Sequence, residues 1–264
     1  MSILFSGDFH ASLSGEIAAI TKKNLLKKYG RKKYNDIKYQ IILGDGGFLW
    51  PGNQKADMEN YKKLARRSFP VLCVIGNHEP MLGMDDTPEA DIGIGEKVLL
   101  VNKEYPFIAY LKRGKVYTID GIKFLVLGGA MSIDKNIRLA DNSWWKREYW
   151  TESEKRDVFK LLETDHIFDC ILSHTGPHRI NKILFQHQSF IPVIDDKVAF
   201  LNEIIDIKIK CREWWCGHWH RDLYFYSSEL NRGYQYLYRT TKILDRMENS
   251  ITVYNEYNKA DRQG

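Results

Sequence analysis

The stretch Gly217-His218-Trp219-His220 places two histidines directly after an apolar run, Glu213-Trp214-Trp215-Cys216. Bulky apolar residues in such a short run predict a buried β-strand. The histidines are therefore expected where that strand ends, which is where α/β sheets carry functional side chains. Four earlier tetrapeptides likewise place metal-ligating residues after a strand-like run. They are Gly7-Asp8-Phe9-His10, Gly44-Asp45-Gly46-Gly47, Gly76-Asn77-His78-Glu79 and Ser173-His174-Thr175-Gly176.

Strand and helix patterns alternate in the first half of the chain. Strands are expected at 3–5, 39–43 and 71–75, with helices at 14–30 and 55–68 between them. The steps from Asp8 to Asp45 and from Asp45 to Asn77 each fit one strand–helix–strand unit of roughly 30 residues or more. Because right-handed crossovers bring the carboxyl ends of parallel strands to one edge, we expect these three side chains to meet.

Short strands dominate the rest of the chain. They are expected at 97–101, 107–111, 115–119, 122–127, 169–172 and 213–216, and in a tail at 222–226, 234–239 and 250–254. The tail strands are predicted to form hairpins along an edge. Helices are expected at 151–163, opened by the capping box Thr151-Glu152-Ser153-Glu154, and at 196–205. Irregular segments are expected at 80–96, 128–150 and between 172 and 196. With no linker or repeat, residues 1–264 are predicted to form one domain, with a motif core at 3–222 and edge strands at 222–255.

Composition limits the class of protein. The 44% hydrophobic and 28% charged content is typical of a soluble globular enzyme, and no apolar run is long enough for a transmembrane helix. A strand at Ile3 leaves no room for a secretory signal. Cys73 and Cys170 lie inside strands and are expected to be buried and reduced, so a cytoplasmic protein is predicted. The net charge of +5 suits an anionic substrate without requiring nucleic acid.

The tetrapeptides supply seven candidate metal ligands. They are Asp8, His10, Asp45, Asn77, His174, His218 and His220. Oxygen and imidazole ligands of this kind suit Mn²⁺, Fe or Zn²⁺ better than Ca²⁺. Seven ligands exceed the needs of one ion, whereas two ions that share a carboxylate would use them all. A water between two such ions becomes a hydroxide nucleophile near neutral pH. His78 diverges from its neighbour Asn77 and is therefore predicted to protonate a leaving group.

In this order, the five tetrapeptides resemble those of the calcineurin-like metallophosphoesterase superfamily over residues 3–222. The resemblance implies a mixed α/β fold, a four-layer αββα sandwich in which helices flank two mixed sheets. It implies two divalent cations, with manganese favoured over iron or zinc. It also implies ligand sets of Asp8, His10, Asp45 and His220 for one ion, and Asp45, Asn77, His174 and His218 for the other. His78 then matches the proton donor, and Glu79 its orienting partner.

One departure from the family pattern bears on the substrate. Protein phosphatases of the superfamily carry an Asp-Arg pair after the second motif and an arginine after the third. This chain has Gly46-Gly47-Phe48 and Pro80-Met81-Leu82 at those places. We therefore consider Arg138, in the loop that follows Gly128, as the residue that holds the phosphate.

These observations predict a dinuclear metal-dependent phosphoesterase that works through a metal-bridging hydroxide. A phosphorylated small molecule, a nucleotide or a phosphoprotein would be the substrate, and phosphatase and phosphodiesterase action both stay open. The alternatives are a nuclease and a non-catalytic, metal-stabilised binding scaffold. A nuclease would use the basic segment 22–33 and the tryptophans Trp144, Trp145 and Trp150. A solvated helix face and a packed loop explain those residues equally well.

Overall fold

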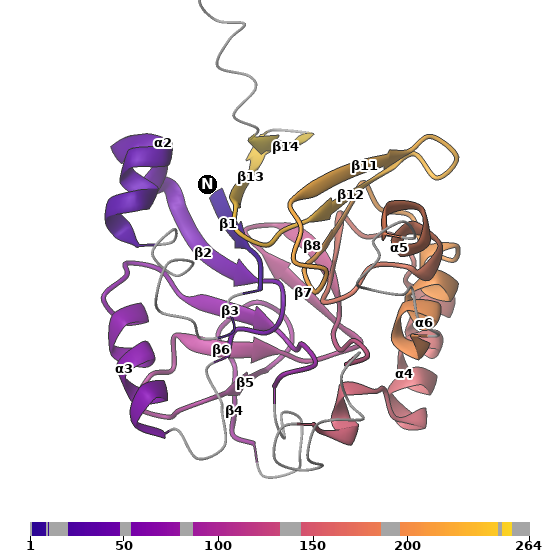
Figure 1. Cartoon of the computed structure of the whole chain (residues 1–264), viewed down its shortest axis with the longest axis horizontal. Coiled ribbons are helices and arrows are strands. Elements are labelled where there is room, and N and C mark those ends of the chain that lie inside the picture. The colour runs from indigo at the N-terminus through magenta and orange to yellow at the C-terminus, as the bar shows by residue number, and fades with distance from the viewer. Residues whose placement is uncertain are drawn as a thin grey trace, which may run out of the picture.

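Two β-sheets packed face to face occupy the centre of the molecule, with helices on both outer sides (Figure 1). The computed structural model describes residues 2–8, 10, 21–47, 54–79, 87–132, 144–185, 196–247 and 250–254. The first sheet has the strand order β14-β13-β1-β2-β3-β6-β5-β4, and the second has the order β11-β12-β10-β9-β8-β7. Parallel and antiparallel pairs occur in both sheets. The predicted mixed α/β fold with two mixed sheets flanked by helices is thereby confirmed.

The strands are short. Those of the first sheet are β1 (Ser2–Ser6), β2 (Ile37–Ile42), β3 (Val71–Val74), β4 (Glu89–Ala90), β5 (Val98–Leu100), β6 (Ile108–Leu111), β13 (Thr241–Met247) and β14 (Ser250–Tyr254). Those of the second sheet are β7 (Lys115–Ile119), β8 (Ile122–Leu127), β9 (Cys170–Ser173), β10 (Glu213–Cys216), β11 (Leu223–Ser227) and β12 (Arg232–Tyr236).

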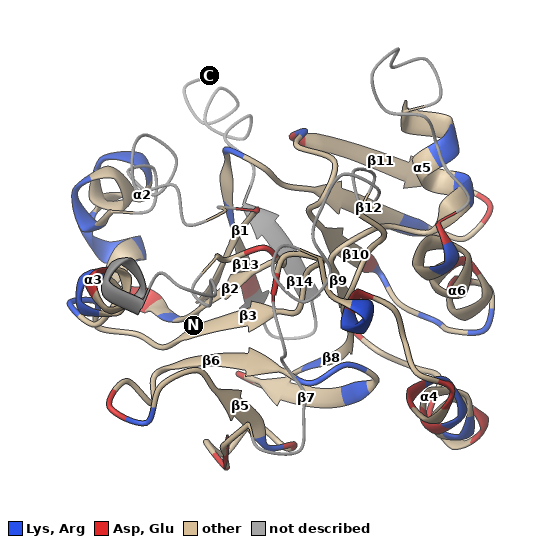
Figure 2. Ribbon diagram, turned by 60° about the horizontal axis from the view of Figure 1, so that its bottom comes forward, with Lys and Arg blue, Asp and Glu red and all other residues tan. Residues whose placement is uncertain are grey.

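The helices form the two outer layers. They are α2 (Lys22–Asp36), α3 (Gln54–Leu64), α4 (Glu152–Thr164), α5 (His178–Phe185) and α6 (Lys197–Asp206), with a short 3-10 turn η2 (Lys146–Glu148). Figure 1 shows α2 and α3 beside the first sheet, and α4, α5 and α6 beside the second. Lysine and arginine residues follow α2 along its length (Figure 2). None of the helices within the described ranges has the length and apolar character needed to cross a bilayer.

The alternation of side chains along β1 shows how the layers are filled. Ile3 and Phe5 point into the core between the sheets, where the Phe5 and Trp215 rings stack at 4.4 Å. Leu4 points the other way and packs with Leu25 of α2. Because both faces of the strand are buried, its sequence is continuously apolar rather than alternating. Cys73 and Cys170 are buried in β3 and β9, as expected, and all four cysteines are free.

Some expected elements differ from the observed ones. Residues 14–20 of the first expected helix lie outside the described residues, and the described helix α2 begins at Lys22. Gly30 leaves helical geometry there, at φ 78°, yet the helix resumes and ends at Asp36. The expected irregular stretch after 172 contains α5, and the expected loop at 80–96 contains β4.

The tail forms hairpins along sheet edges, as expected, but its strands divide between the two sheets and include β13, which was not predicted. β11 and β12 do form an antiparallel pair, but β12 also runs parallel to β10. The chain then crosses to the other sheet, where β13 lies between β14 and β1. Ile243 and Leu244 are fully buried, so β13 belongs to the core of the molecule.

Candidate metal centre

All seven candidate ligands lie just beyond the carboxyl ends of strands. Asp8, Asp45 and Asn77 follow β1, β2 and β3, which are parallel neighbours in the first sheet. His174 follows β9, and His218 and His220 follow β10, which is parallel to β9 in the second sheet. The centre therefore forms where the strand ends of the two packed sheets meet.

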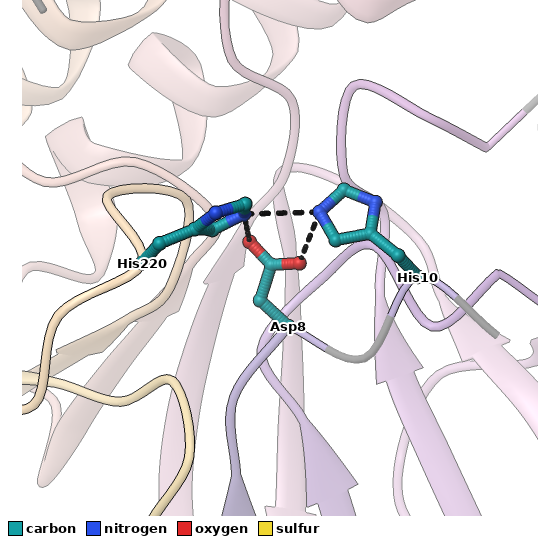
Figure 3. Close-up of side chains that lie close together, drawn as sticks. All are labelled: Asp8, His10 and His220. Atoms are coloured by element: carbon teal, nitrogen blue, oxygen red, sulfur yellow. Dashed lines mark hydrogen bonds and ion pairs between the residues drawn. The ribbon is translucent and has the colours of Figure 1, made fainter. Parts of the chain in front are cut away.

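Asp8 lies between two histidine rings (Figure 3). Its Oδ1 is 2.7 Å from Nε2 of His10, and its Oδ2 is 3.3 Å from Nε2 of His220. The two Nε2 atoms are 3.0 Å apart. Both carboxylate oxygens of Asp8 are buried, and among the described residues these two histidine nitrogens face them. A buried carboxylate is costly unless a cation or a protonated partner compensates its charge.

Asp45 contacts three histidines. Its Oδ2 is 3.2 Å from Nε2 of His174 and 3.8 Å from Nε2 of both His10 and His78. Its Oδ1 accepts a hydrogen bond of 2.9 Å from the backbone N–H of His78. The Asp45 carboxylate thus links the Asp8 cluster to the residues around His174.

His174 is completely buried and its orientation is fixed. Its Nδ1 lies 2.8 Å from the carbonyl oxygen of Leu43, which can only accept, so Nδ1 carries the proton. Its Nε2 then faces Asp45 Oδ2 and the Oδ1 of Asn77, which is 2.9 Å away. The half-buried ring of His218 packs edge-on against His174, at 5.0 Å between centroids.

These separations fit ligands that share a metal ion. Bonds of roughly 2.0–2.2 Å to imidazole and carboxylate place two ligands of a tetrahedral ion about 3.3–3.6 Å apart. Among the described residues, three sets of ligand atoms lie within 4.8 Å of one another: Asp8–His10–His220, His10–Asp45–His78 and Asp8–Asp45–His174. The buried Asp8 oxygens and the convergent imidazole nitrogens together form a candidate cation site.

The electrostatics of the metal-free cluster lead to the same conclusion. Burial raises the pKa of Asp8, but His10 and His220 outweigh it and lower the pKa to about 2. Burial lowers the pKa values of His10 and His174, yet the neighbouring aspartates raise them to about 9 and about 10. Without a metal, the aspartates therefore favour protonation of these histidines, and the cluster as a whole favours positive charge.

Backbone geometry at the site explains the glycines of the motifs. His10, Asp45, His218 and His220 all have positive φ, between 46° and 66°, a region that costs energy for residues other than glycine. A Cβ on Gly76 would lie 2.0 Å from Asp45 Oδ1, and one on Gly44 would lie 2.2 Å from His174 Nδ1. Only glycine leaves room for the ligands at these two positions.

Glu79 is buried behind Asp45. Its carboxylate accepts hydrogen bonds from the backbone N–H groups of Asp45, Gly46 and Gly76, at 2.5 to 3.2 Å. Burial and the charge of Asp45 raise the pKa of Glu79 to about 8. The described contacts make Glu79 a residue that holds the Asp45 loop in place, and its expected role toward His78 stays a prediction.

Ser132 and Glu148, which lie behind Asn77, were not singled out from the sequence. Asn77 Nδ2 donates a 2.9 Å hydrogen bond to Ser132 Oγ, and Ser132 in turn contacts Glu148. Ser132 lies shortly after the Gly128-Gly129 pair that follows β8. This position just beyond a strand end was the sequence signal that could have identified Ser132.

Arg138, the expected phosphate ligand, lies outside the described residues. The suggested stacking tryptophans Trp145 and Trp150 are buried in the body of the protein.

The sequence model of the calcineurin-like phosphoesterase family matches residues 1–222. This chain belongs to that family. The family membership expected from the sequence motifs is thus confirmed, and the protein is a phosphoester hydrolase. No curated protein sequence matches this phosphoesterase.

Solved structures share the fold at low sequence identity. GAP50, the anchor in the inner membrane complex of Plasmodium, is 10% identical, with 96% of this chain and 83% of that chain covered at a TM-score of 0.50. A putative 5'-nucleotidase from Staphylococcus aureus is 12% identical, with 96% and 52% covered at 0.47. The phosphopantetheinyl hydrolase of Mycobacterium tuberculosis is 14% identical, with 90% of each chain covered at 0.45.

Proposed function

We propose that this phosphoesterase holds two divalent cations with Asp45 between them. Asp8, His10, Asp45 and His220 would bind one cation, and Asp45, Asn77, His174 and His218 the other. The observation that carries the proposal is the position of Asp45 Oδ2, 3.2 Å from His174 and 3.8 Å from His10, two histidines of different ligand sets. A carboxylate between two such sets fits a bridging ligand.

The ligand chemistry favours Mn²⁺, with iron or zinc as alternatives. When bound, such a pair supplies an acidified water as nucleophile and positive charge for the phosphoryl oxygens. The chain's own residues orient the reaction. The aspartates would hold the cations, and the buried imidazole of His174 would exclude water from the rear of the centre.

His78 is the proposed proton donor. Its ring lies edge-on to His10 at 4.8 Å between centroids, and its Nε2 is 3.8 Å from Asp45 Oδ2. A hydrogen bond from the His78 backbone N–H to Asp45 joins the two residues, and the His78 side chain is 14% exposed. From there an imidazolium would deliver its proton to a departing alkoxide.

The unequal exposure of the histidines supports an approach of the substrate from the side of His10 and His220. The side chain of His174 is 0% exposed, that of His10 is 30% exposed and that of His220 is 47% exposed. On the open side, the Tyr238 ring stacks on His220 at 4.5 Å, and the Arg239 guanidinium lies 5.2 Å from the centre of the Tyr238 ring. An aromatic ring and a cation beside the metals suit a phosphorylated small molecule or a nucleotide.

A panel of phosphoesters tests this function on protein whose metal content has been measured. Comparison of a mono-aryl with a bis-aryl phosphate in Mn²⁺ separates phosphatase from phosphodiesterase action. Asp45→Asn is expected to reduce turnover by orders of magnitude, whereas Asp157→Asn, an exposed change on α4, should leave it unchanged. A metal-loaded but inert protein would contradict the proposal and favour a scaffold. Salt-sensitive cleavage confined to nucleic acid would favour a nuclease.

A further inference from the structure

Asn77 must present a particular end of its side-chain amide to a cation. A metal binds the carbonyl oxygen of an amide and not its NH₂ group, which has only protons to offer. In the structure, Oδ1 faces His174 Nε2 at 2.9 Å, while Nδ2 faces Ser132 Oγ at 2.9 Å. The two ends are similar in shape, so the surrounding hydrogen bonds must determine which end faces the metal site.

Ser132 distinguishes the two ends because of its own contact with Glu148. Ser132 Oγ lies 2.6 Å from Glu148 Oε2, and the backbone N–H of Ser132 points at the same carboxylate from 3.3 Å. A carboxylate only accepts hydrogen bonds, so the serine hydroxyl gives its proton to Glu148. The lone pairs of Ser132 Oγ are then left for a donor, and the NH₂ group of Asn77 is that donor.

Glu148 itself is held rigidly. It ends the turn η2, and only 3% of its surface is exposed. The buried guanidinium of Arg113 donates from Nη1 to the carbonyl oxygens of Arg147 and Glu148, at 3.0 and 3.3 Å. Its Nη2 bonds both carboxylate oxygens of Glu154, at 3.0 and 3.1 Å. Arg113 thus ties the backbone that carries Glu148 to Glu154 at the start of α4.

We infer that Glu148 and Ser132 are positioning residues that fix the Asn77 amide with its oxygen toward the second cation. This inference rests on the proposed dinuclear centre. Hydrogen bonds behind a metal ligand typically alter metal affinity by about 10- to 100-fold when they are removed. A reversed amide would instead direct two N–H groups at the cation.

Manganese titration of Glu148→Gln and Ser132→Ala tests the inference. Free Mn²⁺ is followed by electron paramagnetic resonance, and folding is checked by circular dichroism. We expect affinity for one of the two Mn²⁺ ions to fall by about 10- to 100-fold while the other is retained, and activity to recover at high Mn²⁺. Ser132→Thr, which keeps the hydroxyl, should stay near wild type. Glu213→Gln removes a half-buried carboxylate at the far end of β10 and should leave both affinities unchanged.

The Glu148→Gln substitution in an Asn77→Asp protein separates a loss of amide orientation from general damage to packing. In Asn77→Asp both ends of the side chain are oxygen, so adding Glu148→Gln should no longer weaken Mn²⁺ binding. An undiminished loss in that background would overturn the inference, as would wild-type affinities in both Glu148→Gln and Ser132→Ala. In those cases the wild-type protein would still bind two ions, and the proposed function would stand. A wild-type protein that binds fewer than two ions would overturn the proposed function and the inference together.

Discussion

Gly76 packs directly against the carboxylate that joins the two halves of the metal centre. A side chain there would lie 2.0 Å from Asp45 Oδ1 and 2.5 Å from the backbone nitrogen of Asp45, and neither can move without shifting the loop. Displacing a reacting group by about 1 Å can cost roughly 100-fold in rate. We therefore expect Gly76→Ala to lower phosphoester turnover by about that factor, as measured in a steady-state assay with saturating Mn²⁺.

Gly93→Ala is the matched control for Gly76→Ala. Gly93 has φ 77°, and no heavy atom of the residues that the structure describes lies within 4 Å of an added Cβ, so its substitution strains the backbone without entering the site. It should lower stability while turnover is retained. Equal losses of turnover in both variants would contradict the packing argument.

Protons compete with metal ions at His10 and His174. The pKa values of these histidines are raised from 6.5 to about 9 and about 10, so near neutral pH both rings are protonated in the metal-free protein. Metal binding must release these protons, and affinity should therefore rise with pH up to about pH 9–10. Calorimetric Mn²⁺ titrations in buffers of different ionisation enthalpy measure this release. An affinity independent of pH between about 6 and 9 would contradict the assignment of these ligands.

The seven candidate ligands could be named from the sequence because each lies in a short motif after a strand. The residues that support these side chains through hydrogen bonds could not be named in this way. Ser132 and Glu148 are linked to Asn77 only through space, and neither residue type predicts such a contact by itself. The hydrogen bonds of Glu79 to the Asp45 backbone also could not be predicted from the sequence, because they depend on how two loops pack together.

At the scale of elements, α4 begins with a reciprocal cap. Thr151 accepts a hydrogen bond from the Glu154 backbone N–H, and the Glu154 side chain accepts one from the Thr151 backbone N–H. Thr151→Ala should therefore destabilise the fold by about 1 kcal/mol. Urea unfolding measures the change. Thr164→Ala, at the exposed end of the same helix, should cost less, and an equal cost in both variants would count against the cap.

The observed elements show where local patterns succeed and fail. The capping box of α4 and the apolar runs of β1, β2 and β3 have strong local signals, and these elements were predicted nearly to the residue. Helix α5 was missed, although Pro177 just before it is typical of a helix start. Gly30 was expected to end a helix, but its positive φ only interrupts α2.

At the scale of the whole molecule, the C-terminal strands complete a sheet that begins at the N-terminus. β13 pairs antiparallel with β1, with Leu244 opposite Ile3, although the family match ends at residue 222. A chain that ends at Thr240 would leave β1 as an exposed, apolar edge. We expect such a chain to show no cooperative thermal unfolding by circular dichroism. A cooperative transition with bound Mn²⁺ would contradict this.

The layers could be predicted from the sequence, but the distribution of strands between them could not. The chain passes to the second sheet between β6 and β7 and returns at β13. Neither crossing has a local signal, because the apolar pattern of a strand does not indicate which of two sheets it joins.

The number and coupling of bound manganese ions test the shared role of Asp45 most directly. Two Mn²⁺ ions that share a carboxylate lie about 3.5–4 Å apart and interact magnetically. Electron paramagnetic resonance of the metal-loaded protein should therefore show two ions per chain with an exchange-coupled spectrum, and Asp45→Asn should abolish the coupling. A single uncoupled ion in the wild-type protein, or coupling that survives in Asp45→Asn, would contradict the account.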